Sequence, residues 1–443
     1  MPARCLLRLD LHVGIHPISH PIFWCPAATQ ATLTRMSESS STSAHPADSP
    51  GTVAVVGGAG HVGLPLGLSF AAAGLRVVLF DINANVFAQL RDGHMPFMEE
   101  GGAELLRAHM GKNLTLSNDP ECLAQVDNIV CIVGTPIDEH LNPQVDHLLR
   151  TVDEIGKHLR STQLFVLRST VFPGATEAID RHLQRLVPGI DVAFCPERVT
   201  QGHALREISG MPQIISGVQE RALARARALF QTICPTTIEL EPIEAELAKL
   251  FCNAWRYITF AIANQFYTVC AENRIDYYAI WEAMRRDYPR MQGLPKAGFA
   301  AGPCLFKDTM QLASFFANDF PLGHSAMLVN EQLPRRIVRL LDQQIHLADK
   351  RVAILGMTFK GDTDDFRESL AFKLRKLLQL ECREVLCTDE YASLPWFVPL
   401  EEAIAQADAV IIGAPHSRYH SLKLDKPFVD PWNILGRGGL VNL

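Results

Sequence analysis

The chain has 443 residues, with 41 Lys and Arg against 48 Asp and Glu and a formal net charge of −7. Its length suffices for about three domains, its composition is that of a globular protein, and without a block of basic residues it is not expected to bind nucleic acid. The eleven cysteines are scattered and lack the spacing of a zinc site or a disulfide framework, and no run reaches the about 18 apolar residues of a membrane span. We therefore predict a cytoplasmic protein that binds no metal, no membrane and no nucleic acid.

The first 50 residues differ in composition from the rest of the chain. His and Pro recur, and residues 37–50 form a polar run, SESSSTSAHPADSP, that cannot bury a core. We predict a disordered arm over residues 1–50. Met36 directly precedes the polar run, so one hypothesis is that translation starts there; N-terminal sequencing of the native protein would show whether residues 1–35 are translated.

Regular structure is predicted to begin at residue 52 with a strand, a glycine-rich turn, a helix and a second strand. Gly58, Gly60 and Gly63 form a G-x-G-x-x-G motif, where the backbone can approach a pyrophosphate at a helix N-terminus. Asp81 follows 18 residues after Gly63, where it would accept a hydrogen bond from a ribose 2′-hydroxyl and repel a 2′-phosphate. An ordinary tight turn is the alternative, but the complete pattern favours a site for NAD over one for NADP. Gly57 adds a glycine that we expect the turn to accommodate.

Polar residues stand at the ends of the next three predicted strands, which lie within 128–134, 164–170 and 191–198, with a helix near 145–159. The carboxyl ends of parallel strands meet at one sheet edge, where ligands bind, so these side chains should face a common site. They are Thr135, Ser169, Thr170, Glu197 and Arg198. For Glu197 the alternative is a solvated loop carboxylate.

A long helix is predicted over residues 241–276, which contain acids and Pro242 at the start and no later Gly or Pro. It is apolar on most sides, which is typical of a helix buried between domains or subunits. Lys249 and Asn253 are spaced i, i+4 and project from one face. A lysine among apolar neighbours is costly unless it serves a site, although an exposed lysine with an incidental amide is the alternative. These neighbours are Leu250, Phe251, Ala254 and Trp255.

Residues 298–308, GFAAGPCLFKD, place one cysteine among small residues, with Lys307 and Asp308 three and four positions after it. A cysteine nucleophile needs an exposed sulfur and a lowered pKa, and small neighbours with a nearby ammonium group favour both. Cys304 is therefore our candidate nucleophile. An ordinary buried cysteine is the alternative.

After two helical regions near 310–316 and 333–347, strands alternate with helices again from residue 351. This second α/β part has no G-x-G-x-x-G motif, so we expect it to bind something other than a second dinucleotide. Lys360 and Arg367 follow its first strand and suit a phosphate or nucleotide, with exposed cations as the alternative. The predicted fold class is α/β, with two Rossmann-like parallel-sheet domains joined by a long central helix.

From Thr52 to its C-terminus the chain resembles the nucleotide-sugar 6-dehydrogenases, the family of UDP-glucose, GDP-mannose and UDP-N-acetylhexosamine dehydrogenases. Seven motifs recur in the order of the family. They are GAGHVGLP (58–65), GTP (134–136), STVFPG (169–174), CPER (195–198), LAKLFCNA (247–254), the C-x-x-K-D run at Cys304, and FKGDTDDFRES (359–369).

The resemblance implies an NAD-binding domain over 51–240, a helical central domain over 241–345 that forms a homodimer, and a nucleotide-sugar-binding domain over 346–443. It also implies a four-electron oxidation, in which two NAD molecules in turn convert the C6 alcohol of the sugar to the aldehyde and then to the acid. The cofactor-binding residues implied are Gly58, Gly60, His61, Val62, Gly63, Asp81, Thr135, Ser169 and Thr170.

Further roles follow from the same resemblance. Cys304 would attack the aldehyde to give a thiohemiacetal and then a thioester; Lys249 and Asn253 would hold the C6 oxygen; Asp308 would manage the proton of the first oxidation. Glu197 would assist thioester hydrolysis, with Thr135 orienting the water. The substrate-binding residues implied are Glu197, Arg198, Lys249, Asn253, Lys307, Lys360 and Arg367, with Lys307 supporting the cysteine loop.

Two departures from the family pattern bear on the substrate. Ala301 and Gly302 stand where many relatives have two glycines, and CPER replaces the NPEF form of UDP-glucose enzymes and is closer to the N-acetylhexosamine branch. The sequence names neither the sugar nor the base. Two other functions stay open: a two-electron hydroxyacid dehydrogenase, and a nucleotide-sugar-binding protein without catalytic activity.

Overall fold

The computed structural model of the chain describes residues 51–141, 143–436 and 441–442, so the predicted arm and Met36 lie outside the described residues. An eight-stranded sheet comes first, in the order β3-β2-β1-β4-β5-β6-β7-β8, and is parallel except that β7 runs antiparallel to β6. Its strands are β1 (Thr52–Val56), β2 (Arg76–Phe80), β3 (Leu114–Ser117), β4 (Asn128–Cys131), β5 (Leu164–Leu167), β6 (Asp191–Phe194), β7 (Gln213–Gly217) and β8 (Thr237–Glu239). The order reverses between β1 and β4, and such a switch point opens a crevice at the carboxyl ends of the strands.

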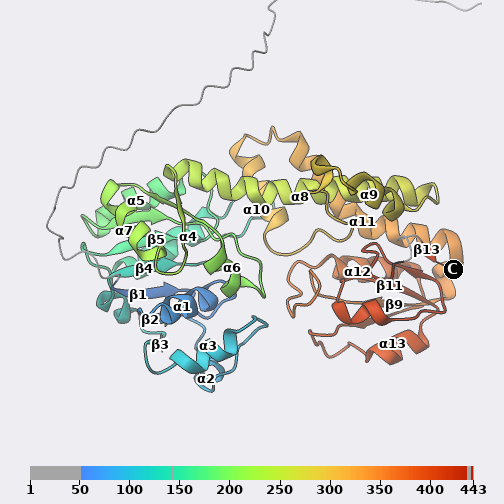
Figure 1. The fold of residues 1–443 in the computed structure, drawn as a ribbon, viewed down its shortest axis with the longest axis horizontal. Coiled ribbons are helices and arrows are strands. Elements are labelled where there is room, and N and C mark those ends of the chain that lie inside the picture. The colour runs from blue at the N-terminus through green and yellow to red at the C-terminus, as the bar shows by residue number, and fades with distance from the viewer. Residues whose placement is uncertain (1–50, 142, 437–440, 443) are drawn as a thin grey trace, which may run out of the picture. The chain divides into compact units, whose positions relative to one another are not determined.

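Helices cover both faces of this sheet (Figure 1). Strands β4, β5 and β6 are buried at every position, as in a parallel sheet with two covered faces. One core cluster packs α1 and α7 against one face, and another packs α4 and α5 against the other. The helices are α1 (Gly63–Ala72), α2 (Phe87–Arg91), α3 (Gly102–His109), α4 (Val145–Gly156), α5 (Ala175–Leu186), α6 (Ala204–Gly210) and α7 (Glu220–Phe230), with short 3-10 turns η1 (Ala84–Val86) and η2 (Pro120–Gln125).

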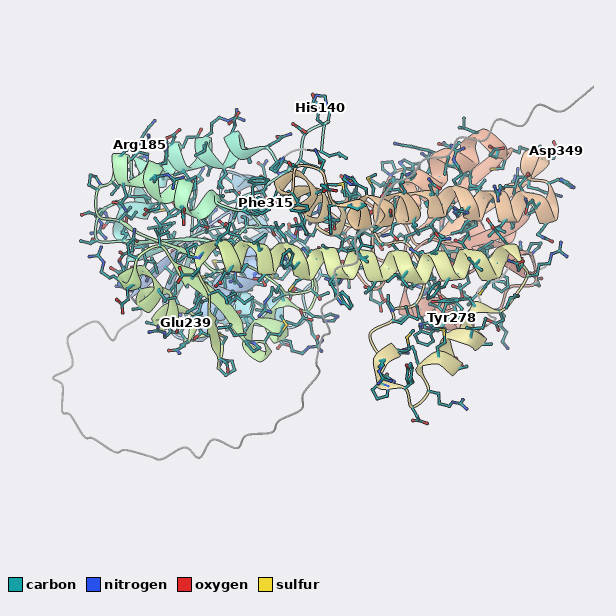
Figure 2. All side chains as sticks on the ribbon, turned by 90° about the horizontal axis from the view of Figure 1, so that it is seen from above. His140, Arg185, Glu239, Tyr278, Phe315 and Asp349 are labelled. Carbon is teal, nitrogen blue, oxygen red and sulfur yellow. The ribbon has the colours of Figure 1, made fainter. Side chains whose placement is uncertain are left out.

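The long helix α8 (Pro242–Glu272) has 31 residues and follows the first sheet. Pro242 lies in its first turn, and Glu241 and Glu244 form a capping box, which explains why the helix begins there. It packs against α9 (Tyr277–Arg285), α10 (Leu305–Phe315) and α11 (Pro321–Ile345); η3 (Pro289–Met291) and η4 (Leu347–Asp349) are short turns. Figure 2 shows α8 and α11 side by side, with Phe315 at the end of α10 close by.

A second sheet has the order β10-β9-β11-β12-β13 and is parallel except for the last pair. Its elements are β9 (Arg351–Leu355), α12 (Leu370–Glu381), β10 (Glu384–Thr388), α13 (Leu400–Gln406), β11 (Ala409–Ile412), η5 (Ser417–Ser421), β12 (Phe428–Val429) and β13 (Val441–Asn442). The predicted fold class is confirmed. Strands β4, β5 and β6 are shorter than predicted, because the chain leaves the ladder before Gly134, Ser169 and Glu197. In the described part of the chain no helix is long and apolar enough to cross a membrane.

Candidate active site

The turn between β1 and α1 has room only for glycine at its critical positions. A Cβ at Gly58 would come within 2.7 Å of the Val55 carbonyl oxygen, and one at Gly63 within 2.2 Å of the Gly57 oxygen. Gly57 has a φ of 77°, so the turn requires this extra glycine instead of merely accommodating it. Asp81 lies beside the turn, where its Oδ2 accepts a hydrogen bond from the Ala59 N–H at 3.0 Å. A tight glycine cradle with a carboxylate at its edge fits the phosphates and ribose of a dinucleotide.

His61 joins this turn to two other segments. Its ring stacks on Phe97 with 4.2 Å between centroids, and a guanidinium nitrogen of Arg367 lies 3.4 Å from its Nδ1. Burial lowers the pKa of His61, and the charge of Arg367 lowers it further. Val62 is the N-cap residue of α1. Arg367, which the sequence analysis assigned to the substrate, thus contacts the glycine turn as well.

Cys304 is the N-cap residue of α10, and the charged residues that follow it join α10 to α8. The Asn253 amide donates to Asp308 Oδ2 at 2.5 Å, and the Lys307 ammonium lies 2.9 Å from Asp308 Oδ1. Asp308 is fully buried. The structure therefore brings Cys304, Asn253, Lys307 and Asp308 together, although Asn253 and Asp308 are 55 positions apart in the sequence.

Lys249 lies one turn before Asn253 on the same buried face of α8, with 8% of the residue exposed. Among the described residues none forms a hydrogen bond or ion pair with its ammonium group, yet its charge acts on Cys304. The apolar residues that the sequence analysis placed around it divide between two faces. Leu250 and Ala254 are buried, whereas Phe251 and Trp255 are 54% and 66% exposed, because they lie on a different side of the helix.

Cys304 is exposed, but the pKa of its thiol is raised in the free protein, so the nearby lysines do not give it the lowered pKa that a cysteine nucleophile needs. Although solvent reaches the side chain, the surrounding protein is dense enough that desolvation raises the pKa, and the Asp308 carboxylate raises it further. Lys249, Lys307 and Arg367 act in the opposite direction with a smaller effect. These three nearby cations thus offset only part of the rise in pKa that burial causes.

Thr135 connects the end of β4 to α10. Its hydroxyl accepts a hydrogen bond from the Lys307 ammonium at 3.1 Å and donates one to the Thr170 carbonyl at 2.6 Å. The buried Gln311 amide donates to the Thr135 carbonyl at 3.3 Å. Ser169 bonds the backbone of Val133. Gln311 was not predicted, although its spacing of seven residues from Cys304 places it on the same side of α10.

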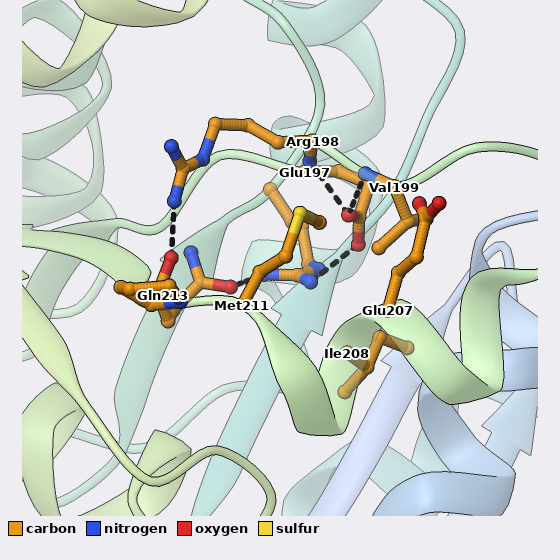
Figure 3. A pocket seen from close by; sticks show the side chains of 9 residues that line it. Glu197, Arg198, Val199, Glu207, Ile208, Met211 and Gln213 are labelled. Carbon is orange, nitrogen blue, oxygen red and sulfur yellow. Dashed lines mark hydrogen bonds and ion pairs between the residues drawn. The ribbon is translucent and has the colours of Figure 1, made fainter.

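Glu197 lines a hollow at the end of β6 together with Arg168, Arg198, Glu207 and Gln213 (Figure 3). It pairs with the buried Arg168, which the sequence analysis did not single out. The guanidinium of Arg198 points away from the Glu197 carboxylate and donates to the Pro212 carbonyl. In the part of the chain that the structure describes, no hydrogen bond or ion pair joins Glu197 to the Cys304 cluster.

Lys360 and Arg367 lie on the loop after β9. The Lys360 ammonium donates to the Gln201 carbonyl in the loop after β6, and burial lowers the pKa of Lys360. Arg367 forms a bidentate pair with Asp365, at 3.0 and 2.6 Å, and its charge acts on Cys304. These contacts bring the loop of the second sheet against the first sheet and near the thiol.

Three successive regions of the chain match models of one protein family. Residues 52–234 match the NAD binding domain of the UDP-glucose/GDP-mannose dehydrogenase family, residues 243–332 match its central domain, and residues 353–437 match its UDP binding domain. These regions follow one another as the first sheet, the central helices and the second sheet do.

Curated relatives match over most of their length. The UDP-N-acetyl-D-mannosamine dehydrogenase of Pyrococcus horikoshii is 30% identical over 393 residues, covering 86% of this chain and 91% of the relative. The NDP-N-acetyl-D-galactosaminuronic acid dehydrogenase of Ralstonia nicotianae is 26% identical, covering 85% and 93%.

Solved structures are similar over the same extent. The UDP-D-ManNAc dehydrogenase of Pyrococcus horikoshii gives a TM-score of 0.81 at 28% identity and covers 86% of this chain and 96% of that one. A UDP-glucose dehydrogenase of Pyrobaculum islandicum gives a TM-score of 0.81 at 25% identity, covering 90% and 98%.

Proposed function

Because this chain belongs to the UDP-glucose/GDP-mannose dehydrogenase family, we propose that it oxidises the C6 hydroxyl of a nucleotide sugar to the carboxylate in two NAD-dependent steps. It is an NAD-dependent dehydrogenase of this family, and the glycine turn with Asp81 fits that cofactor. The single observation that carries the proposal is the meeting of an exposed cysteine, a buried unpaired lysine and a buried Asn–Asp pair.

In the first oxidation Lys249 and Asn253 hold the C6 oxygen and stabilise the negative charge that develops on it. Asp308, with Lys249 and a water molecule, takes up the proton of the hydroxyl. Bound NAD supplies the hydride acceptor for both oxidations. The buried, unpaired ammonium group of Lys249 supports this role, since its charge is not neutralised by any other described side chain.

In the second oxidation the sulfur of Cys304 adds to the aldehyde carbon to form a thiohemiacetal, and loss of the remaining C6 hydrogen gives a thioester. Water then adds to the thioester carbonyl, the carbon–sulfur bond breaks, and the carboxylate product leaves. Glu197 takes a proton from that water molecule, and Thr135 orients the water molecule. Covalent capture by Cys304 keeps the aldehyde from escaping.

For the substrate we propose a UDP-N-acetylhexosamine ahead of UDP-glucose. The relatives named for UDP-N-acetyl-D-mannosamine and for an N-acetylgalactosaminuronic acid derivative support this choice, as does the CPER form of the motif at 195–198. Lys307, Lys360, Arg367 and Arg198 would contact the nucleotide sugar.

We also propose the domain limits 51–240 for NAD binding, 241–345 for the centre and 346–443 for the nucleotide sugar. The chain would work as a cytoplasmic homodimer through α8 and supply uronic acids for polysaccharide synthesis. The exposed apolar side chains of α8 support the dimer.

The test is to count NADH formed per sugar, by absorbance, for UDP-N-acetylmannosamine, UDP-N-acetylglucosamine, UDP-glucose and GDP-mannose. Two NADH per sugar supports the proposal. One NADH per substrate, with activity on a hydroxyacid, indicates a two-electron dehydrogenase, and binding without NADH indicates a silent binding protein. In Cys304→Ala net oxidation should be lost while calorimetric NAD binding persists; uronate production at the unmodified rate would remove Cys304 from the mechanism.

A further inference from the structure

A fully buried guanidinium group lies under the Glu197 carboxylate. Arg168 directly follows β5, with 1% of its side chain exposed. It donates to Glu197 Oε2, to the Cys195 carbonyl at 3.1 Å and to Gln213 Oε1 at 3.1 Å. Its carbon Cζ lies 5.1 Å from the centroid of the Phe230 ring. Burying a guanidinium is costly unless acceptors surround it, and here both terminal nitrogens donate hydrogen bonds, whereas Nε has no partner among the described residues.

The remaining contacts of Glu197 come from its own loop. Its Oε1 accepts from the Arg198 N–H at 2.6 Å and from the Val199 N–H at 2.8 Å. A carboxylate has about four lone-pair positions, of which three are filled here. The free position is on Oε2, the oxygen that Arg168 holds, and 12% of the Glu197 side chain is exposed.

Gln213 braces the same arrangement from β7. While its Oε1 accepts from Arg168, its Nε2 donates to the Pro196 carbonyl at 3.0 Å, on the residue before Glu197. Arg168 and Gln213 therefore fix both the carboxylate and the backbone that carries it (Figure 3). Because these contacts hold the Glu197 carboxylate on three sides, it has a single orientation. A general base needs such a fixed orientation, and a solvated loop carboxylate lacks it.

We propose that Arg168 is a positioning residue for hydrolysis of the acyl-enzyme: it aims Oε2 of Glu197 at the attacking water. The inference rests on the proposed function. In the step that it serves, a water proton goes to Oε2, the water oxygen bonds to the thioester carbon, and the carbon–sulfur bond breaks with its electron pair on Cys304. No oxidant is needed, so Arg168 acts after both NADH molecules have formed.

The experiment uses the full chain and the nucleotide sugar on which the wild-type protein forms two NADH. Arg168→Met should lower kcat about 100-fold, the cost of misplacing a catalytic group by about 1 Å. The first turnover should still release two NADH per site, and acid quenching followed by intact-mass analysis should find the sugar acyl group on Cys304. Arg168→Lys keeps the charge and should accumulate less of this adduct.

Arg225→Met is the matched control. Arg225 also bonds a buried carboxylate, Asp191 at 2.9 Å, and two carbonyl groups, but at the opposite end of β6. Its loss should cost stability without accumulation of the adduct. If Arg168→Met accumulates no more acyl-enzyme than Arg225→Met, or loses the NADH burst itself, the inference fails.

Should circular dichroism show Arg168→Met unfolded, Gln213→Leu takes its place, because it removes the brace and leaves the charge. An acyl-enzyme on Cys304 in that variant supports the inference, and its absence overturns it. Failure of the proposed function is a different result, since the wild-type protein would then form no NADH, or one per sugar.

Discussion

Burial and nearby charges shift the pKa of the Cys304 thiol in opposite directions. Burial and the Asp308 carboxylate raise its pKa, while the three nearby cations lower it. A raised pKa means that the free protein holds a protonated thiol at neutral pH, and that the thiolate forms only as the pH rises through that higher pKa. The reactivity of Cys304 in the free protein should therefore increase with pH above the range of an ordinary cysteine.

Two substitutions should move this titration in opposite directions. Asp308→Asn removes a charge that raises the pKa of Cys304, so alkylation should begin at lower pH; Lys249→Met removes a charge that lowers it, so alkylation should begin at higher pH. Iodoacetamide labelling as a function of pH, with mass mapping of the peptide that contains Cys304, measures both shifts. Cys382, on the second α/β part, is the internal reference. Shifts of the same sign in both variants would contradict the electrostatic account.

At the scale of elements, the start of α8 is tied to the start of α5 by one carboxylate. Glu246 is buried and accepts hydrogen bonds from the Gly174 N–H at 2.6 Å, the Thr176 N–H at 2.7 Å and the Thr176 hydroxyl at 2.6 Å. Because Lys249 is one turn further along α8, this contact fixes the face of the helix that carries Lys249 against the start of α5.

Glu246→Gln should therefore destabilise the fold by about 1–3 kcal/mol, since its amide group would face backbone donors that are left unsatisfied. Urea unfolding followed by circular dichroism measures the change. Glu272→Gln, at the other end of α8 and bonded to the half-buried Arg336 and the exposed Arg339, should cost less than about 1 kcal/mol. Equal losses in the two variants would show that the contact to α5 adds nothing.

The loop that carries Lys360 is held by a buried histidine. His416 Nδ1 accepts from the Asp362 N–H at 3.0 Å, and its Nε2 lies 3.0 Å from Asp389 Oδ2. Asp389 in turn accepts from the N–H groups of Met357 and Thr358, as Asp81 does from the first turn. In the second sheet, the turn after β9 is thus held by Asp389 and His416, in the position that Asp81 takes beside the turn after β1.

His416→Phe should loosen this loop and raise the KM for the nucleotide sugar about tenfold, the equivalent of one hydrogen bond of about 1.4 kcal/mol, with the KM for NAD unchanged. Steady-state kinetics with each substrate varied in turn separates the two. His420→Phe is the control, because His420 bonds the Ile434 carbonyl and not the Lys360 loop. A rise in both KM values would indicate a general loss of structure.

At the scale of the whole molecule, α8 leaves an apolar strip exposed. Its members are Phe251, Trp255, Ile262, Phe266 and Val269. Residues of this kind on one helix are typical of the covered core of a subunit interface.

Trp255→Glu should convert the proposed dimer to a monomer, because it places a charge in the centre of the proposed interface. Size-exclusion chromatography with light scattering measures the mass. Leu380→Glu, at an equally exposed apolar residue of α12, should leave the mass unchanged. A wild-type protein that already elutes as a monomer would defeat the proposed assembly.

Local patterns in the sequence were sufficient for the fold class, although strands β3, β7 and β8 were not predicted. The glycine turn, the apolar strands and the uninterrupted helix each depend on neighbours within about 30 residues, so their periodicity and turn residues reveal them. The grouping of Lys249 and Asn253 also follows from helical spacing alone. The resemblance to a family supplied Asp308 and Glu197 as partners in one mechanism.

Contacts between distant segments could not be read in this way. The pairing of Arg168 with Gln213 joins residues 45 positions apart, and the charges that act on the pKa of Cys304 include Lys249 and Arg367, which are distant from it in the sequence. The sequence also did not tell which side of α8 is covered, since Phe251 and Trp255 are as apolar as Leu250. Tertiary packing decides such points, and no local pattern records it.

The contact between His61 and Arg367 joins the glycine turn to the loop after β9, and this bears on the exchange of cofactor. In the proposed reaction a fresh cofactor must replace the spent one while the half-oxidised sugar stays attached to sulfur. Arg367 reaches the glycine turn from the same loop whose Lys360 would hold the nucleotide sugar. Departure of the spent cofactor and retention of the intermediate would then both depend on the contacts of a single loop.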